Sequence, residues 1–78
     1  MDHDVQYDGK TVWVHSSDGF TVARFGTRGI DVHLPDASGC LECTHGPTDL
    51  KAWERFVEAC GEHYGCEIPP EATPDRFR

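Results

Sequence analysis

Three closely spaced turn signals constrain the fold of this chain more than any other feature of its sequence. Asp8-Gly9 is typical of a two-residue hairpin turn, and glycine-containing turns follow at residues 16–19 and 26–29. The segments between these turns are short, and their apolar side chains alternate with polar ones. Such segments form strands that pair antiparallel with their neighbours along the chain. The sequence therefore predicts an antiparallel meander of three to four strands.

In the predicted strands Val12 and Val14 share one face, and Phe20 and Val22 lie on the opposite face from Ala23 and Phe25. The strands comprise residues 11–15, 20–25 and 30–34, with a weaker segment around Val5 and Tyr7. Alternation in the last strand directs three side chains inward, namely Ile30, Val32 and Leu34. The same alternation directs Asp31 and His33 outward, so polar groups of this strand are expected on the face away from the core.

One amphipathic helix is predicted over residues 50–64. Its apolar side chains recur at helical spacing, at positions 50, 53, 56, 57, 60 and 64. Thr48 is the predicted N-cap, with Asp49 in the first turn, and Gly65 suits the position that ends a helix. Residues 35–47 have neither a helical nor a strand period, and they are predicted to be a loop. The fold class is therefore α+β, in which the C-terminal helix packs on the small meander.

The length of 78 residues allows one domain with a small core. We expect this domain to span residues 1–66, and residues 67–78, which contain three prolines, to form an extended tail. Domains of this size often depend on disulfides or a structural metal for stability. The four cysteines are therefore the first residues to consider for a site.

The segment from His33 to His45 carries the strongest chemical signal. Cys40 and Cys43 are separated by two residues, a spacing at which both thiolates can turn toward one metal ion. His33, Cys40, Cys43 and His45 together offer two thiolates and two imidazoles, which is a closed ligand set for a structural Zn²⁺. Asp31 shares a face with His33 and could orient its imidazole. Such a zinc would join the last strand to the entry of the helix.

Other uses of the cysteines stay open at this stage. Cys60 and Cys66 could replace the histidines in an all-cysteine site, and His15 could replace the strand histidine. The C-x-x-C pair could instead form a disulfide, stay as free thiols or act as a redox pair. The redox interpretation lacks the βαβ pattern that usually surrounds such a pair.

No catalytic signature accompanies these ligands. A catalytic zinc keeps an open coordination position and a nearby general base, and Glu42 between the two cysteines is expected to point to solvent. The sequence contains no H-E-x-x-H, no phosphate-binding loop and no nucleophile elbow, and Gly39 stands where zinc deaminases have a proline. We therefore expect a structural metal and no enzyme activity.

The charge of the chain favours a protein partner over nucleic acid. The net charge is −7, whereas contacts between basic side chains and phosphates dominate the affinity of nucleic-acid binders. Glu54, Glu58 and Glu62 follow one another at one helical turn and form an acidic ridge, which either faces solvent or docks on a basic partner surface. No apolar run suggests a signal peptide or a membrane span, so we expect a cytoplasmic protein with reduced thiols.

Several motifs of the chain resemble a group of small uncharacterised proteins from bacteria and their phages or prophages. The resemblance covers roughly residues 13–65 and lies mainly in WVH, RFG, GIDVH and CxxCTHG. It supports treating the two histidines and two cysteines of residues 33–45 as one unit, and Cys60 and Cys66 lie outside the pattern. The resemblance implies no activity. Together with the small size, the negative charge and the lack of a catalytic set, it supports the hypothesis of a phage- or prophage-type accessory protein that acts on a host or phage protein.

Three hypotheses on function follow. The first is a small zinc-stapled interaction module that binds a protein through its acidic surface. The second is a zinc-containing nucleic-acid or transcription-complex binder, which requires a basic, aromatic strip on the sheet made by Trp13, Phe20, Phe25, Arg24 and Arg28. The third is a small metal-dependent hydrolase, which requires an exchangeable water on the metal and a cleft beside it.

Overall fold

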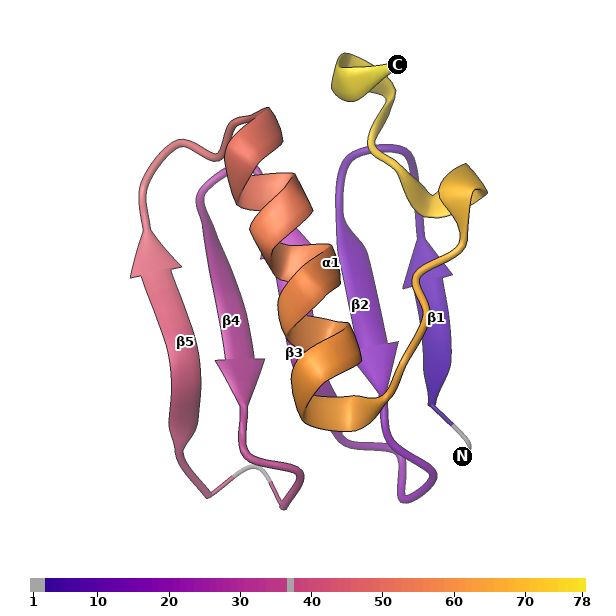
Figure 1. Ribbon diagram of the computed structural model, residues 1–78, viewed down its shortest axis with the longest axis vertical. Helices are drawn as coiled ribbons and strands as arrows, with labels where there is room; N and C mark the ends of the chain where they lie inside the picture. The colour runs from indigo at the N-terminus through magenta and orange to yellow at the C-terminus, as the bar shows by residue number, and fades with distance from the viewer. Residues whose placement is uncertain (1–2, 37) are drawn as a thin grey trace.

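Five strands form one antiparallel sheet whose spatial order follows the order of the chain (Figure 1). The computed structural model describes residues 3–36 and 38–78. Its strands are β1 (Asp4–Tyr7), β2 (Val12–His15), β3 (Thr21–Gly26), β4 (Gly29–His33) and β5 (Cys40–His45). The α+β class and the meander are confirmed, and the sheet has more strands than the sequence predicts.

The additional strand is β5, which lies in the segment predicted to be a loop. Its residues pair antiparallel with β4, for example Glu42 with Val32 and Thr44 with Ile30. Directly paired residues share a face of the sheet, so two polar side chains of β5 lie on the same face as the apolar side chains of β4. The strand therefore lacks the alternation that marks a strand in a sequence, and the loop prediction is wrong because only pairing with β4 makes this segment a strand.

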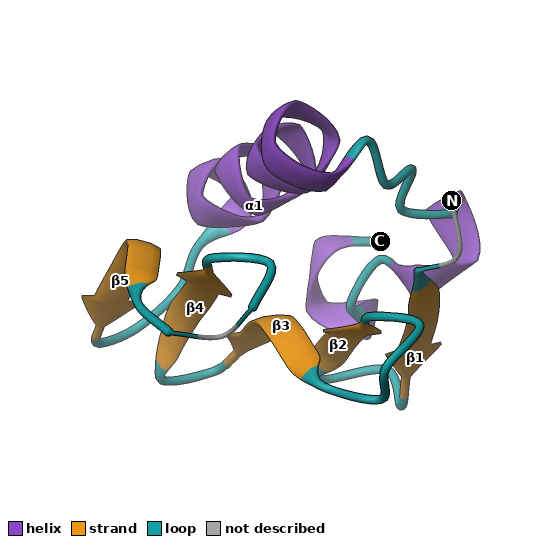
Figure 2. Cartoon of the chain, turned by 90° about the horizontal axis from the view of Figure 1, so that it is seen from below, coloured by secondary structure: helices purple, strands orange, loops and turns teal. Residues whose placement is uncertain are grey.

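The helix α1 (Leu50–Tyr64) covers one face of the sheet, and the C-terminal segment lies on the same side (Figures 1 and 2). Alternate residues of the inner strands supply most of the buried side chains of the sheet, and Val22 at the β2–β3 bulge adds one more: Val12, Val14, Val22, Ala23, Phe25, Ile30 and Val32. The helix supplies Trp53, Phe56, Ala59, Cys60 and Tyr64. Among the described residues, no element covers the opposite face of the sheet (Figure 2).

Phe25 lies at the centre of the aromatic part of this core. Its side chain is fully buried, and its ring centroid is 5.1 Å from that of Trp53 and 5.6 Å from that of Phe56. Phe77 from the C-terminal segment lies at 6.1 Å on a further side. The sheet, the helix and the C-terminal segment therefore all meet on one β3 side chain.

The ends of α1 show one correction and one confirmed prediction. The N-cap is Asp49, whose carboxylate accepts a hydrogen bond of 2.9 Å from the backbone N–H of Ala52. Thr48, the predicted cap, instead donates its hydroxyl hydrogen to the carbonyl of Gly26 and so ties the helix entry to the β3–β4 turn. Gly65 ends the helix in the left-handed conformation at φ 63°, as the sequence predicts.

Replacement of Asp49 by alanine is expected to lower the free energy of unfolding by about 1 kcal/mol, because the N–H of Ala52 loses its acceptor. Urea denaturation followed by circular dichroism measures this loss. Lys51→Ala is the matched control, since Lys51 is an exposed residue of the same turn and alanine is an equally good helix former. Equal stability of the two variants would contradict the assignment of Asp49 as the cap.

Residues 67–78 fold back onto the domain and do not form the extended tail that the sequence predicts. They contain two short 3₁₀ turns, Pro70–Ala72 and Asp75–Phe77. Ile68 and Ala72 join the buried core, and the backbone N–H of Asp75 donates a 2.8 Å hydrogen bond to the carbonyl of Gly9. The prolines restrict the backbone to tight turns, and the apolar side chains between them bind the segment to the sheet.

Candidate metal centre and acidic helix surface

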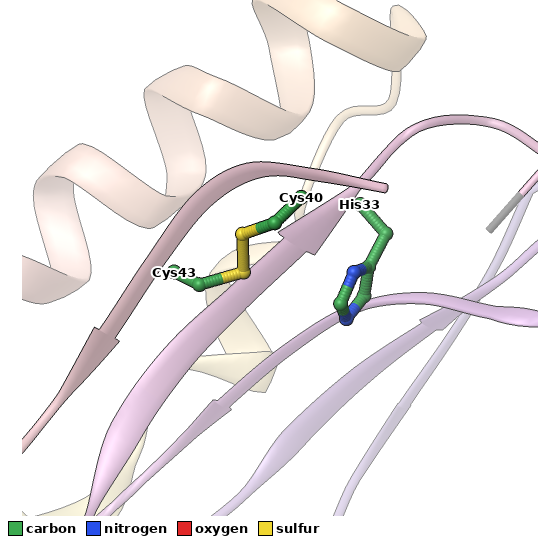
Figure 3. Close-up of side chains that lie close together, drawn as sticks. All are labelled: His33, Cys40 and Cys43. Carbon is green, nitrogen blue, oxygen red and sulfur yellow. A yellow bond between two sulfur atoms is a disulfide. The ribbon is translucent and has the colours of Figure 1, made fainter. Parts of the chain in front are cut away.

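A register shift between β4 and β5 brings Cys40 and Cys43 onto the same face of the sheet. In a regular strand, residues three positions apart point to opposite faces. Here Asp31 pairs with Cys43, but His33 pairs with Cys40, so β5 contains one extra residue at a β-bulge. Both cysteines therefore face outward beside β4, with their Cα atoms 6.2 Å apart and their sulfurs joined in a disulfide (Figure 3).

His33 completes a group of three metal-ligating side chains at this end of the sheet. One ligand atom each of His33, Cys40 and Cys43 lies within 4.8 Å of the others. Ligand atoms around a tetrahedral zinc lie roughly 3.3–3.8 Å apart, given zinc–ligand distances of about 2.0–2.3 Å. Side-chain adjustments of about 1 Å would therefore bring the three atoms to coordination distance once the disulfide is opened. Because metals bind the thiolate, reduction of the disulfide must precede coordination.

A hydrogen bond holds the imidazole of His33 in place. Its Nδ1 lies 3.2 Å from the carbonyl oxygen of Gly39 in the β4–β5 connection. A carbonyl can only accept a hydrogen bond, so Nδ1 carries the proton and the lone pair of the neutral ring is on Nε2. Metal-ligating histidines are commonly oriented by such a contact through their second nitrogen. The sequence gives no signal for this role of Gly39, because it depends on how the connection folds.

Tyr64, on the helix side of the sheet, binds the backbone of His33. Its hydroxyl oxygen lies 2.9 Å from the carbonyl oxygen of Val22 and also contacts the carbonyl oxygen of His33. Burial, and secondarily the nearby Cys60, raises the pKa of Tyr64 to about 12. The hydroxyl therefore stays protonated at neutral pH, and its single hydrogen is shared between these two carbonyls. In the sequence, Tyr64 is recognisable only as the last member of the apolar stripe of the helix.

Three other predicted site residues lie outside the group. His45, the fourth ligand of the predicted set, is at the opposite end of β5 from Cys40, where it pairs with Gly29. Asp31, predicted to orient His33, forms an ion pair with Arg24 at 3.6 Å. His15 is on β2 and is separated from β4 by the intervening strand β3. The structure therefore brings together three of the four predicted ligands, and it places the orienting contact at Gly39.

Cys60 and Cys66 lie in the core between α1 and the sheet, so the all-cysteine site is wrong. Both are free thiols and buried, whereas the C-x-x-C pair is on the uncovered face of the sheet. Burial raises the pKa of Cys60 to about 12, with a smaller contribution from Cys66, and burial also raises the pKa of the Cys66 thiol. Both thiols therefore stay protonated and serve as small apolar residues.

The three glutamates of the acidic ridge, Glu54, Glu58 and Glu62, are all exposed on α1. Arg55 contacts Glu58 and also Glu62, the latter at 3.3 Å. The same guanidinium forms a bidentate salt bridge with Glu42 on β5. Its Nε donates a hydrogen bond of 2.9 Å to Oε1, and one of its terminal nitrogens donates a second hydrogen bond to Oε2. Arg55 therefore neutralises part of the ridge and joins the helix to the edge strand of the sheet.

The contact with Arg55 predicts a loss of stability in acid. The hydrogen bond to Arg55 lowers the pKa of Glu42 below its ordinary value of 4.5. A carboxylate whose pKa is lower in the folded state stabilises the fold above the unfolded value, and this stabilisation is lost as the pH falls through the folded value. Glu42→Gln is therefore expected to flatten the decline of stability below pH 4.5, as measured by urea unfolding across pH 2–7.

Glu54→Gln provides the control for this experiment, because Glu54 is an exposed glutamate on the outer side of the same helix. Its replacement should leave the acid limb of the stability profile unchanged. If Glu42→Gln and the wild-type protein lost stability in parallel below pH 4.5, the Arg55 contact would contribute nothing measurable in solution.

A shallow groove of about 460 Å³ runs beside the acidic ridge at the C-terminal end of α1. The helix and the segment that follows it line this groove with Val57, Gly61, Gly65, Cys66, Glu67 and Ile68. A Cβ added at Gly61 or Gly65 would meet no atom within 4 Å, so the two glycines leave this side of the helix open.

The five residues named in the nucleic-acid hypothesis do not all lie on one face of the sheet. Phe25 is fully buried on the helix side, and Arg24 forms its ion pair with Asp31. Trp13 does lie on the outward face, since it pairs with Gln6 on one side and Arg24 on the other. Phe20, which is 53% exposed, and Arg28 are exposed as well, so four of the five residues that the hypothesis names are at least partly accessible.

Comparison of the chain with known protein families, with curated proteins and with solved structures finds no match. Within the described residues, the helices are too short or too polar to cross a membrane.

Proposed function

We propose that this protein is a small zinc-stapled interaction module that binds a basic segment of a partner protein along the exposed face of α1. The grouping of His33, Cys40 and Cys43 at one end of the sheet is the observation that carries the zinc part of this proposal. The resemblance to small bacterial and phage proteins fits an accessory protein that acts on a host or phage protein.

Zinc is the metal that suits this ligand set. Two thiolates and one imidazole are typical zinc ligands, and soft sulfur ligands disfavour magnesium, calcium and manganese. His33 ends β4 and Cys40 begins β5, so the ion would hold the ends of these two strands together across their connection. The zinc therefore staples two strands of the sheet, and not the last strand and the helix entry as the sequence suggests.

Native mass spectrometry of the reduced protein tests the zinc. We expect one zinc per chain, lost with a strong chelator and in Cys43→Ser. Cys66→Ala should keep its zinc because Cys66 lies in the core on the other side of the sheet. At a free zinc concentration of a hundred times Kd, binding would add about 2.7 kcal/mol to the stability, which raises Tm by roughly 10 °C or more in a domain of this size. A reduced protein that takes up no zinc would refute the staple.

The acidic ridge and the groove beside it define the partner surface. Glu54, Glu58 and Glu62 offer three exposed carboxylates within three helical turns, and Glu67 lines the adjacent groove. Arg55 stays bound to Glu42 when partner cations approach the ridge, because this salt bridge is bidentate and Glu42 lies on β5, outside the ridge. The surface therefore suits an amphipathic segment with Lys or Arg beside an apolar side chain that enters the groove.

A peptide-display selection against the zinc-loaded protein tests this surface with a defined probe, a random-peptide library. Enriched peptides are expected to carry Lys or Arg around an apolar residue and to bind more weakly as salt rises. The variant Glu54→Gln/Glu58→Gln/Glu62→Gln should lose binding at least about tenfold, since each exposed charge pair contributes up to about 1 kcal/mol.

The matched control removes the same charge from other surfaces, in Asp4→Asn/Asp18→Asn/Glu71→Gln. All three of these acids are exposed and lie outside α1. This control should bind the selected peptides as the wild type does. Equal losses in the two triple variants would show that net charge alone attracts the peptides, and selected peptides without basic residues would exclude the proposed surface.

A further inference from the structure

We infer that the metal held by His33, Cys40 and Cys43 keeps its fourth coordination position open to the outside of the molecule, where a neutral nitrogen donor of the imidazole class replaces a bound water. This inference rests on the proposed zinc site. It differs from the closed four-ligand set that the sequence predicts, and it gives the uncovered face of the sheet a binding site of its own.

Within residues 3–36 and 38–78, the only group of three or more metal-ligating side chains close enough to share an ion is His33, Cys40 and Cys43, so no fourth side chain of this part of the chain joins them. His45 faces the same side as Cys43 but lies two residues farther along β5, about 7 Å away and in the direction opposite to Cys40. His15 is two strands away from His33, or about 10 Å across the sheet. Asp31 is engaged by Arg24. Glu42, between the two cysteines, pairs with inward-facing Val32 and binds Arg55 on the helix side.

The surroundings of the group give an external donor access to the metal. Cys40 is exposed, and both cysteines lie on the face of the sheet that no described element covers (Figures 2 and 3). By contrast, the imidazole of His33 is held by Gly39 and its backbone by Tyr64. One side of the centre is therefore fixed by the fold, and the other side faces solvent.

The charge of the centre indicates the class of donor. Two thiolates neutralise a divalent zinc, so an added anion gains little net attraction. Asp31, which pairs with Cys43, forms an ion pair with Arg24. A neutral nitrogen donor can replace water without adding charge, and imidazole is among the donors that zinc prefers.

The site forms from the disulfide in two balanced steps. A dithiol reductant such as dithiothreitol transfers two electrons and two protons to the Cys40–Cys43 disulfide, yields two thiols and is itself oxidised to a cyclic disulfide. The divalent metal then binds both sulfurs and His33, and two protons are released to solvent.

Cobalt(II) substitution of the reduced protein tests the open position, with free imidazole as the probe. Cobalt should bind one per chain, with thiolate-to-cobalt absorption and visible bands typical of four coordination. Titration with imidazole is expected to shift the visible bands with one-site saturation. Bands that do not respond to imidazole would show a closed site and overturn the inference, whereas a failure of cobalt to bind at all would refute the underlying metal site.

Two further measurements identify what would close the site. His45→Ala should keep the cobalt spectrum and the imidazole response of the wild type, since His45 lies outside the group formed by His33, Cys40 and Cys43. A changed spectrum in this variant would show that His45 is the fourth ligand of a closed site.

Native mass spectrometry should show a monomer with one metal, and a metal-linked dimer would show that a second copy occupies the fourth position. His33→Ala, expected to weaken cobalt binding, is the positive control.

Discussion

Gly29→Ala is expected to destabilise the protein by about 3 kcal/mol or more and to separate β5 from β4. Gly29 has a φ of +155°, and an added Cβ would collide with the backbone carbonyl oxygen of Thr44 on the neighbouring strand. Relief of this collision requires one of the two backbones to shift beside the Gly29–His45 pair of the β4–β5 ladder. For a chain of 78 residues, whose stability is roughly 4–12 kcal/mol in total, this is a large fraction.

Urea unfolding followed by tryptophan fluorescence measures this effect, and Gly61→Ala is the matched control. Gly61 lies inside α1, where an added Cβ meets no atom within 4 Å. Alanine should therefore stabilise the helix by about 0.5–1 kcal/mol relative to glycine. Replacement of glycine by alanine is therefore expected to lower the free energy of unfolding at position 29 and to raise it at position 61. Wild-type stability in Gly29→Ala would contradict the observed pairing of β5 with β4.

Phe25→Ala is expected to have the largest effect in the core, a loss of about 3–5 kcal/mol. Phe25 is fully buried and stands between Trp53, Phe56 and Phe77. Its removal leaves a cavity between β3, α1 and the C-terminal segment, and all three would have to move to fill it. Since the whole stability is roughly 4–12 kcal/mol, much of the variant should be unfolded well below the Tm of the wild type in a thermal scan by circular dichroism.

Phe20→Ala is the control for Phe25→Ala, because it also removes a phenylalanine but leaves the packing of the core unchanged. Phe20 immediately precedes β3, and 53% of its surface is exposed. Its replacement should change the stability by no more than about 0.5 kcal/mol, as for other surface positions. A loss in Phe20→Ala as large as in Phe25→Ala would contradict the exposed position of the Phe20 side chain.

The two faces of the sheet separate the two proposed roles. The helix side carries the core, the acidic ridge and the groove, and the other side carries His33 and the cysteine pair. Arg55 and Glu42 connect these regions, because Glu42 stands between the two cysteines in β5 and binds the helix. Metal binding at Cys40 and Cys43 should therefore restrict the strand that positions Arg55 within the acidic ridge.

The candidate site was predictable in its residue types but not in its geometry. The C-x-x-C spacing and the outward direction of His33 are visible in the sequence, and both cysteines meet His33 in the structure. The exclusion of His45 was not predictable, because it depends on β5 being an extended strand that carries His45 away from Cys40. The bulge that turns both cysteines outward depends on the pairing with β4, and so does the contact between His33 and Gly39.

By itself the sequence determined the elements that rest on local interactions. Tight turns with glycine, alternation in β2 to β4, the apolar stripe of α1 and its end at Gly65 all follow from contacts within a few residues. Only the tertiary structure decided β5, the folded tail and the choice of Asp49 over Thr48 as the cap. In each of these cases a distant partner, namely β4, the β1–β2 turn or the carbonyl of Gly26, supplies the hydrogen bonds or packing, and no local pattern encodes that partner.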